Sequence, residues 1–309
     1  ISGIHVDASF RRYFRITTDH QSWVAMDAPP EKEEKTQQFV QIAKHLYRAG
    51  IQVPEIVAEN IAEGLLLLTD FGDEYLLNAL NHTTVDHLYS NAMQGILQLQ
   101  SCSKVSNLEL PHFDETHIRT ELNLFNDWYL KQSLNINLKS SQEKMLEKLF
   151  QLLINNALSQ PQVFTHRDYH SRNLMLLPHN IIGIIDFQDA VIGPITYDLV
   201  SLLKDCYIAW PADKTYQWVE NFCSELLRKH KFSLNEFTYW FDLIGLQRHL
   251  KVIGIFSRLH IRDNKSRYLS DIPRIFNYIE AVVSRYHELN DFKTFLSDCI
   301  LPLKKVANT

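Results

Sequence analysis

The segment from residue 166 to residue 187 gathers side chains that can do chemistry. Two carboxylates, Asp168 and Asp186, stand on either side of the carboxamide of Asn173. Two carboxylates and a neutral oxygen donor suit a hard cation such as Mg²⁺, which binds one or two carboxylates and completes its shell with water and phosphate. The other carboxylate can orient or deprotonate a hydroxyl group. The segment therefore predicts a Mg²⁺ site beside a base.

A β-hairpin is needed to bring these side chains together. Two apolar runs, 174–177 and 181–185, are separated by Pro178-His179-Asn180, a sequence typical of a turn. A hairpin centred on residue 179 places residue 173 opposite residue 185. Asn173 and Asp186 then meet at its open end, and the loop that carries Asp168 enters the same end.

The same residues resemble those of a known superfamily. His166-Arg167-Asp168-x4-Asn173 matches the protein-kinase catalytic loop H-R-D-x4-N. Because Ile185-Asp186-Phe187 follows it, the segment is similar to the aminoglycoside phosphotransferase and choline kinase branch. Asp70-Phe71-Gly72 precedes the catalytic loop, where that fold has the hinge between its lobes, so it is not the metal motif. The resemblance implies a two-lobed, protein-kinase-like α+β fold, with a small antiparallel-sheet lobe over 1–72 and a mainly helical lobe over 73–309.

Motifs along most of the chain narrow the resemblance. They resemble those of bacterial anomeric N-acetylmuramate/N-acetylglucosamine kinases and occupy residues 7–15, 26–31, 67–70, 193–199 and 246–251. The resemblance implies transfer of the ATP γ-phosphate to the C1 hydroxyl of an N-acetylated amino sugar, in peptidoglycan recycling. It also implies roles for single residues: Asp168 as catalytic base, Asn173 and Asp186 as Mg²⁺ ligands, Thr69, Asp70 and Phe71 at the nucleotide, and His166 and Asp198 as structural supports.

One departure from protein kinases concerns the phosphates of ATP. The strand that carries V-A-I-K in kinases reads Val24-Ala25-Met26-Asp27 here, so a carboxylate replaces the phosphate-binding lysine. A cation must then come from elsewhere in this lobe, and Arg12 or Arg15 is the expected substitute. Ser9 and backbone N–H groups would hold the phosphates, because the loop lacks the glycine-rich motif.

The substrate side is expected to be helical. An aromatic ring can stack on the apolar face of a sugar, and an arginine can hold a carboxylate through two hydrogen bonds. Seven basic and two acidic residues lie between 244 and 274, which favours an anionic over a polycationic ligand. The alternative interpretation is a solvated helix face. The candidate substrate residues are Glu121, Trp128, Arg248, Arg258 and Tyr268.

The elements that must position these residues follow from periodicity. Short strands are predicted near 13–17, 23–26, 55–59 and 64–69, with a helix over 31–48 between the two pairs. Helices then predominate, at about 83–100, 115–132, 197–208, 214–229, 273–289 and 292–301. Ser140-x-x-Glu143 and Ser233-x-x-Glu236 are interpreted as capping boxes that begin two more helices.

Composition limits the class of protein. With 45% hydrophobic and 22% charged residues, the chain is typical of a globular protein, and its net charge of −5 disfavours a nucleic-acid partner. No apolar run is long enough for a membrane span, and the first residues do not resemble a signal peptide. Four scattered cysteines suit a reducing cytoplasm. No protein partner is implied.

Three other functions stay open from the residues alone. The first is a kinase of an aminoglycoside or a choline-like amine. The second is a nucleotide-binding regulator without turnover, suggested by Asp27 in place of the lysine. The third is a metal-dependent phosphohydrolase that uses His166, Asp168, His170 and Asp186.

Overall fold

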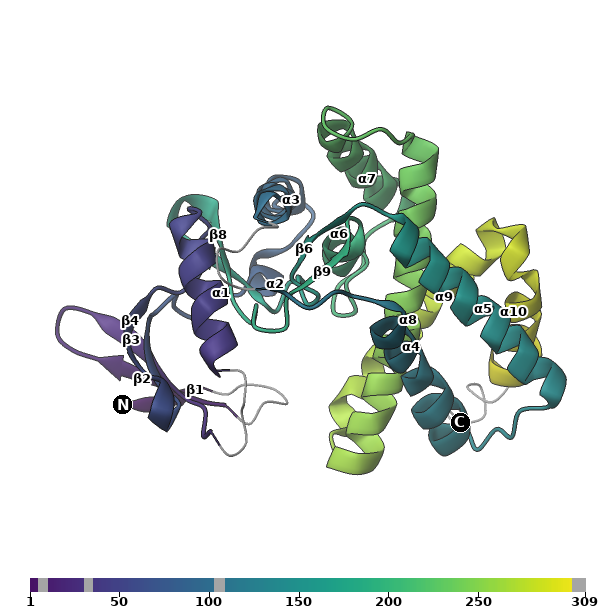
Figure 1. The fold of residues 1–309 in the computed structure, drawn as a ribbon, viewed down its shortest axis with the longest axis horizontal. Helices are drawn as coiled ribbons and strands as arrows, with labels where there is room; N and C mark the ends of the chain where they lie inside the picture. Colours follow the sequence, from purple (N-terminus) through teal and green to yellow (C-terminus); the bar gives the residue numbers. More distant parts are fainter. Residues whose placement is uncertain (5–10, 31–35, 103–108, 302–309) are drawn as a thin grey trace. The chain divides into compact units, whose positions relative to one another are not determined.

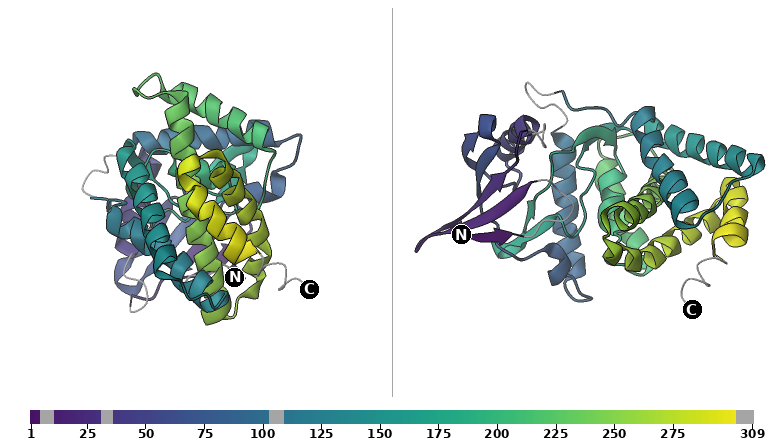
Figure 2. Two further views of the ribbon diagram at one scale, coloured as in Figure 1. Left: turned by 90° about the vertical axis from the view of Figure 1, so that its right-hand side faces the viewer. Right: turned by 90° about the horizontal axis from the view of Figure 1, so that it is seen from below.

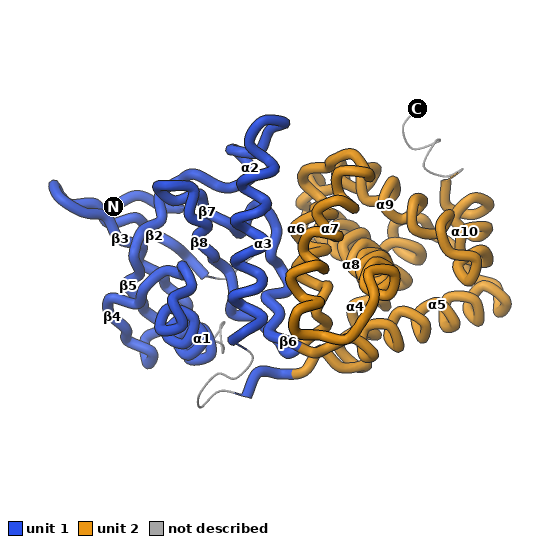
Figure 3. The backbone as a smooth tube through the Cα atoms, turned by 90° about the horizontal axis from the view of Figure 1, so that it is seen from above, with its two compact units in different colours: residues 1–111, 163–192 blue, residues 112–162, 193–309 orange. Residues whose placement is uncertain are grey.

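A computed structural model describes residues 1–4, 11–30, 36–102 and 109–301. The chain forms two compact units (Figure 3). The first combines Ile1–Pro111 with Val163–Ile192, and the second combines His112–Gln162 with Gly193–Thr309. These units do not coincide with lobes divided at residue 72, because the predicted hairpin groups with the N-terminal residues. The division into lobes 1–72 and 73–309 stays a prediction.

The first unit contains a five-stranded antiparallel sheet in the order β1-β2-β3-β5-β4 (Figure 1). Its strands are β1 (Ser2–Ile4), β2 (Arg12–Thr17), β3 (Ser22–Asp27), β4 (Ile56–Asn60) and β5 (Leu65–Thr69). Four of them agree with the predicted strands to within one or two residues. The edge strand β1 was not predicted, because three residues that include a glycine give no strand pattern.

Helix α1 (Thr36–Arg48) lies beside this sheet and buries one face of its amphipathic sequence. Its buried apolar side chains are Phe39, Val40, Ile42, Ala43 and Leu46. Gly64 lies in the left-handed region at φ 69°, where a Cβ atom would collide with the carbonyl oxygen of Ala28. The turn that leads into β5 therefore requires glycine.

The rest of the first unit carries the predicted hairpin. It contains α2 (Leu76–Ala79), α3 (Val85–Ser101), β7 (Leu174–Leu177) and β8 (Ile181–Ile184), and the boundaries between the units fall within β6 (Gln162–Thr165) and β9 (Val191–Pro194). Strands β7 and β8 pair antiparallel, with Leu174 opposite Ile184 and Leu177 opposite Ile181. Both pairs are centred on residue 179, so the predicted register is confirmed.

The second unit is helical and is built around α8 (Leu234–Asp263), a 30-residue helix (Figures 1 and 2). Helix α8 packs on each of the main neighbours in this unit. These are α4 (Glu115–Leu124), the π-helical η2 (Phe125–Ser133), α5 (Ser140–Ser159), α6 (Tyr197–Leu203), α7 (Ala212–Leu226), the short η4 (Ser266–Asp271) and α9 (Ile272–Arg285). The chain continues through η5 (His287–Leu289), α10 (Asn290–Phe295) and η6 (Leu296–Ile300). The fold is therefore α+β, as the sequence predicts.

Helix boundaries show where local signals succeed. The Ser233 hydroxyl accepts a hydrogen bond from the Glu236 backbone at 3.1 Å and caps α8 as predicted. The capping box at Ser140 and Glu143 was wrong by one residue. The N-cap is Lys139, whose backbone N–H donates to Gln142 Oε1 at 2.8 Å. Within the described ranges, none of the helices has both the length and the apolarity that a membrane crossing requires.

Candidate active site

The hairpin brings Asp168, Asn173 and Asp186 together within the first unit. The Ile185 backbone N–H donates to the Asn173 carbonyl at 3.1 Å, which continues the β7–β8 pairing by one residue. The Asn173 carboxamide donates from Nδ2 to the Asp168 carbonyl at 3.1 Å and to Asp186 Oδ2 at 3.3 Å. Asp168, Asn173 and Asp186 therefore meet at the open end of the hairpin.

Asp186 is held by neutral donors. Its Oδ1 accepts a hydrogen bond from Gln188 Nε2 at 2.8 Å, and its Oδ2 accepts the bond from Asn173. The backbone at Asp186 has φ 65°, a left-handed conformation that costs free energy for a residue with a Cβ atom and is frequent at functional sites. No pattern in the sequence indicated Gln188, two residues after Asp186, as a partner of this carboxylate.

The fully buried imidazole of His166 lies under the loop. Its Nε2 donates to the Ile185 carbonyl at 3.0 Å, and its Nδ1 accepts from the Asp168 backbone N–H at 3.3 Å. These contacts join the Asp168 loop to the end of the hairpin and support the predicted structural role.

The loop is anchored a second time through Tyr169. The buried Tyr169 hydroxyl donates to the Ala92 carbonyl of α3 at 2.8 Å. A Cβ atom at Gly95, on the next turn of α3, would lie 2.5 Å from that hydroxyl oxygen. Gly95 therefore leaves the space in which the phenol ring anchors the loop.

The donor set fits a metal ion that arrives with a phosphate ligand. Among the described residues, no three His, Cys, Asp or Glu side chains gather as a metal-binding cluster. Two carboxylates and one carboxamide are nevertheless the oxygen donors that Mg²⁺ prefers. Asp186 is also solvent-exposed, so a ligand can reach it.

Asp27, which replaces the phosphate-binding lysine of protein kinases, has a paired carboxylate. Asp27 lies opposite Arg12 in the β2–β3 pairing, and the two side chains form an ion pair. The Arg12 side chain is 63% exposed. The protein itself therefore neutralises Asp27, and the guanidinium stays accessible to solvent.

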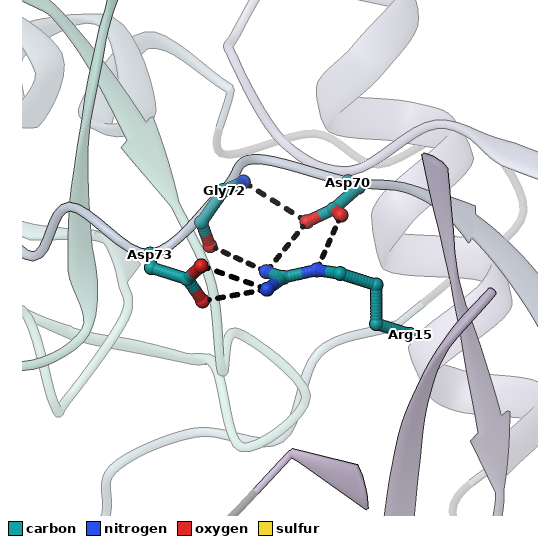
Figure 4. A network of polar contacts seen from close by, with 4 residues as sticks. All are labelled: Arg15, Asp70, Gly72 and Asp73. Atoms are coloured by element: carbon teal, nitrogen blue, oxygen red, sulfur yellow. Dashed lines mark hydrogen bonds and ion pairs between the residues drawn. The ribbon is translucent and has the colours of Figure 1, made fainter. Parts of the chain in front are cut away.

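Arg15 has a different environment (Figure 4). It donates from Nε to Asp70 at 2.6 Å, from Nη1 to Asp73 at 2.8 Å and from Nη2 to the Gly72 carbonyl at 3.0 Å. The hydrogen bond to Asp70 is the main reason that the pKa of Arg15 is raised. Burial would raise the pKa of Asp70, but the hydrogen bonds from Arg15 and from the Gly72 backbone hold it below its ordinary value. Arg15 thus fixes the predicted hinge segment to β2.

The hinge segment is also attached to the hairpin. The Leu176 backbone donates to the Glu74 carbonyl at 2.7 Å, and Tyr75 forms a β-bridge with Met175. A Cβ atom at Gly183 would lie 2.7 Å from the ring of Phe71. Thr69 accepts a hydrogen bond from the Glu55 backbone at 2.9 Å. The predicted nucleotide residues Thr69, Asp70 and Phe71 therefore lie on a segment joined to the strands that carry the triad, whereas Ser9 lies outside the described residues.

The predicted substrate residues lie in the helical unit, and most of them already have partners there. The Glu121 carboxylate accepts from Gln247 at 2.9 Å and pairs with Lys251 at 2.8 Å. The buried Arg248 guanidinium lies over the Tyr197 ring at 5.4 Å. Buried Tyr268 stacks on Phe256, with ring centroids 5.1 Å apart. Asp198, in the first turn of α6, is 2% exposed. The side chains of the other two substrate candidates, Trp128 and Arg258, are half-buried.

Comparisons with known proteins agree with this geometry. Residues 1–233 match the sequence model described as the phosphotransferase enzyme family. A Pseudomonas aeruginosa protein named N-acetylmuramate/N-acetylglucosamine kinase is 41% identical over 94% of this chain and 86% of its own length. A Neisseria meningitidis protein of the same name is 36% identical over 95% of this chain and 89% of its own.

Solved structures share the fold at low sequence identity. The GDP complex of aminoglycoside 2′-phosphotransferase-IIIa has a TM-score of 0.62 at 16% identity, covering 90% of this chain and 93% of that one. A choline kinase from Streptococcus pneumoniae has a TM-score of 0.59 at 12% identity, covering 88% and 89%. The protein-kinase-like fold implied by the sequence is thereby confirmed.

Proposed function

The chain belongs to the phosphotransferase enzyme family, and from this premise we propose that it transfers the γ-phosphate of ATP to the anomeric hydroxyl of an N-acetylated amino sugar. The observation that carries the proposal is the meeting of Asp168, Asn173 and Asp186 at the open end of the β7–β8 hairpin. The names of the curated relatives, N-acetylmuramate/N-acetylglucosamine kinase, support this acceptor.

Asp168 acts as the base. Its carboxylate orients the C1 hydroxyl and accepts its proton while the hydroxyl oxygen forms a bond to the γ-phosphorus. The bond from that phosphorus to the bridging oxygen breaks, and ADP leaves with its electron pair. His166 and Tyr169 hold the loop, so that the carboxylate is positioned before the substrate binds.

Asn173 and Asp186 would hold Mg²⁺, which when bound neutralises part of the phosphate charge. The Asn173 carboxamide also positions Asp186, because it donates to that carboxylate in the protein itself. The Mg²⁺ ion would enter the site bound to ATP, as part of the proposed MgATP substrate.

Arg12 is the better candidate for a phosphate contact than Arg15. Arg12 is exposed and has one ion pair, with Asp27, so exchange of that partner for a phosphate costs little. Arg15 is 19% exposed and is committed to Asp70, Asp73 and the Gly72 carbonyl. We assign Arg15, with Thr69, Asp70 and Phe71, to the segment that contacts the nucleotide base, and Ser9 to the phosphates.

The acceptor is expected at the helical unit. Trp128 and Arg258 are half-buried there and can contact a ligand, whereas Glu121, Arg248 and Tyr268 would support that surface from inside. An acid or a neutral N-acetyl sugar suits this basic segment better than an aminoglycoside or choline. A cytoplasmic role in peptidoglycan recycling follows from this substrate class.

ADP release measured with MgATP and one acceptor at a time tests the proposal. We expect activity with N-acetylglucosamine and N-acetylmuramate, and none with kanamycin or choline. The methyl glycoside of N-acetylglucosamine, whose anomeric oxygen is blocked, is the matched acceptor control and should be inert. Equal activity with the methyl glycoside would exclude the anomeric position.

The protein control uses two carboxylates. Asp168→Asn should lower turnover by about 10²-fold to 10⁴-fold, because the amide cannot accept the proton. Asp213→Asn changes an exposed carboxylate in the first turn of α7 and should leave turnover unchanged. Equal turnover of Asp168→Asn and wild type would remove Asp168 from the role of base.

A further inference from the structure

One stripe of α8, within the helical unit, packs against α4 and η2. Gln247 and Lys251, one turn apart, both bind the Glu121 carboxylate of α4. Gly254, one turn further, lies so close to η2 that a Cβ atom there would collide with the backbone of Leu124. This stripe has the i, i+4, i+7 spacing of one helix face.

The next position on this stripe is Arg258. Residue numbers rise in the same direction along the two facing helices: Glu121 lies beside Lys251, and Leu124 lies beside Gly254. One turn beyond the closest approach, the position on α8 is Arg258 and that on η2 is Trp128. The π-helical turn η2 begins at Phe125, at the contact with Gly254, and such turns are frequent at functional sites.

The side chain of Arg258 is half-buried. Its Nε is buried without a hydrogen-bond partner, and no ion pair joins Arg258 to another described residue. The nearby carboxylate of Asp263 is already held by Arg262, through two hydrogen bonds of 2.8 Å and 2.9 Å. The ion pairs of the other arginines in the described ranges include Arg119 with Glu147, Arg228 with Glu225, Arg274 with Asp271 and Arg285 with Asp242.

A half-buried guanidinium without a counterion is unfavourable in the free protein. Burial, followed by the charge of Arg262, lowers the pKa of Arg258. A ligand carboxylate reverses this cost, because a guanidinium binds it through two parallel hydrogen bonds. The side chain is therefore poised for an anionic group of a ligand.

We propose that Arg258 binds the carboxylate of an acidic N-acetyl amino sugar and thereby determines the preference of this protein for the acidic over the neutral acceptor. The inference rests on the proposed function. The two sugars in the names of the relatives differ by one lactyl ether that ends in a carboxylate. Arg258 recognises this group, and the rest of the site recognises what the two sugars share.

The test compares kcat/KM for the two sugars. Arg258→Gln should lower kcat/KM for N-acetylmuramate by about 10-fold to 100-fold, the loss of a charge-assisted hydrogen-bonded pair, and for N-acetylglucosamine by less than about threefold. Arg258→Lys should recover part of the loss, because it restores the charge without the bidentate geometry. Arg228→Gln is the matched control, since that arginine is exposed and paired with Glu225, and it should shift neither value.

A substrate variant makes the test independent of folding. Wild-type protein should phosphorylate the amide of N-acetylmuramate as poorly as Arg258→Gln phosphorylates the acid. Equal kcat/KM of the wild type for the acid and the amide would overturn the proposal, as would an equal loss for both sugars in Arg258→Gln. If the wild-type protein phosphorylated neither sugar, the proposed function itself would be overturned.

Discussion

Two carboxylates in this protein, Asp242 in the helical unit and Asp186 in the first unit, have opposite surroundings. Asp242 is fully buried, and its Oδ1 accepts from Lys204 at 2.7 Å and from Tyr216 at 2.6 Å. Its Oδ2 accepts from Arg285 and Tyr286, each at 2.8 Å. Burial would raise the pKa of Asp242, but these donors, Lys204 above all, hold it below its ordinary value.

Asp186 is exposed and accepts hydrogen bonds from two carboxamides, those of Asn173 and Gln188. Two cations compensate the charge of Asp242, whereas both of these donors to Asp186 are neutral. Neutral donors fix the position of a carboxylate and leave its charge to interact with a ligand. The difference teaches that the number of polar partners says little about function, and that the net charge of those partners says more.

The largest expected effect tests this difference at Asp186. Asp186→Ala should reduce turnover about 10³-fold, because it removes a direct ligand of the proposed Mg²⁺. The free energy of unfolding should change by less than about 1 kcal/mol, as for other exposed side chains. Single-turnover kinetics across a Mg²⁺ titration and urea unfolding measure the two quantities. Unchanged Mg²⁺ dependence would contradict the assignment.

The converse is expected at Asp242. Asp242→Asn should lower the free energy of unfolding by about 3 kcal/mol, because Lys204 and Arg285 then lose their counterion in a buried site. Urea unfolding measures the loss. Adding Lys204→Met should restore part of the stability, and strict additivity of the two changes would show that they do not interact.

A pH effect belongs to the same helical cluster. His249 is buried, donates to the Lys204 carbonyl at 3.1 Å and stacks on Tyr278. Burial, together with the charges of Lys204 and Arg248, lowers its pKa to about 3, whereas the unfolded chain has the ordinary value of 6.5. Between these values the unfolded state binds the extra proton, so stability is lost as the pH falls below 6.5.

The loss attributable to His249 should be about 2 kcal/mol between pH 7 and pH 5. The depressed pKa of Asp242 acts only at still lower pH, below its ordinary 3.8. Unfolding of the wild type and of His249→Gln, compared at pH 7 and pH 5, measures this contribution. An identical pH dependence in the two proteins would show that His249 does not titrate in this way.

The smallest effect concerns the exposed pair of Arg12 and Asp27. Arg12→Ala should weaken ATP binding about tenfold, or about 1.4 kcal/mol, if the guanidinium moves to the phosphates. Unfolding should change by less than about 1 kcal/mol, the usual contribution of an exposed ion pair. Asp27→Ala is the matched control and should not weaken ATP binding. Isothermal titration with MgATP separates the two residues, and equal losses would reduce Arg12 to a partner of Asp27.

Local patterns predicted the parts of the site that depend on local geometry. The β7–β8 register followed from one turn centre, since a hairpin fixes every opposite pair once its turn is known. The contact between Asn173 and Asp186 followed from that register. The ion pair of Asp27 with Arg12 follows from the register of β2 and β3, which places the two residues opposite each other.

Contacts between distant segments could not be predicted in this way. The π-helical turn after Leu124 coincides with the close approach of Gly254, which is 130 residues later in the chain. The Asp242 cluster joins α6, α7, α8 and α9, and no spacing in the sequence marks it. Lys139 rather than Ser140 is the N-cap of α5, because the Gln142 side chain accepts a hydrogen bond from the Lys139 backbone. This contact replaces the capping box that was expected one residue later.

The first unit is built from two separate segments of the chain, and this governs the order in which the protein can fold during synthesis. Residues 1–111 emerge from the ribosome first, but their hydrogen bonds from Tyr169 to Ala92 and from Ile184 to Gln52 require the segment 163–192. At ordinary translation rates this segment follows roughly 4–16 s later. During that interval α2 and α3 lack the hairpin that they pack against, so the nascent chain exposes apolar surface to chaperones and to other chains. Insertions between 112 and 162 would lengthen this exposure without changing Asp168, Asn173 or Asp186.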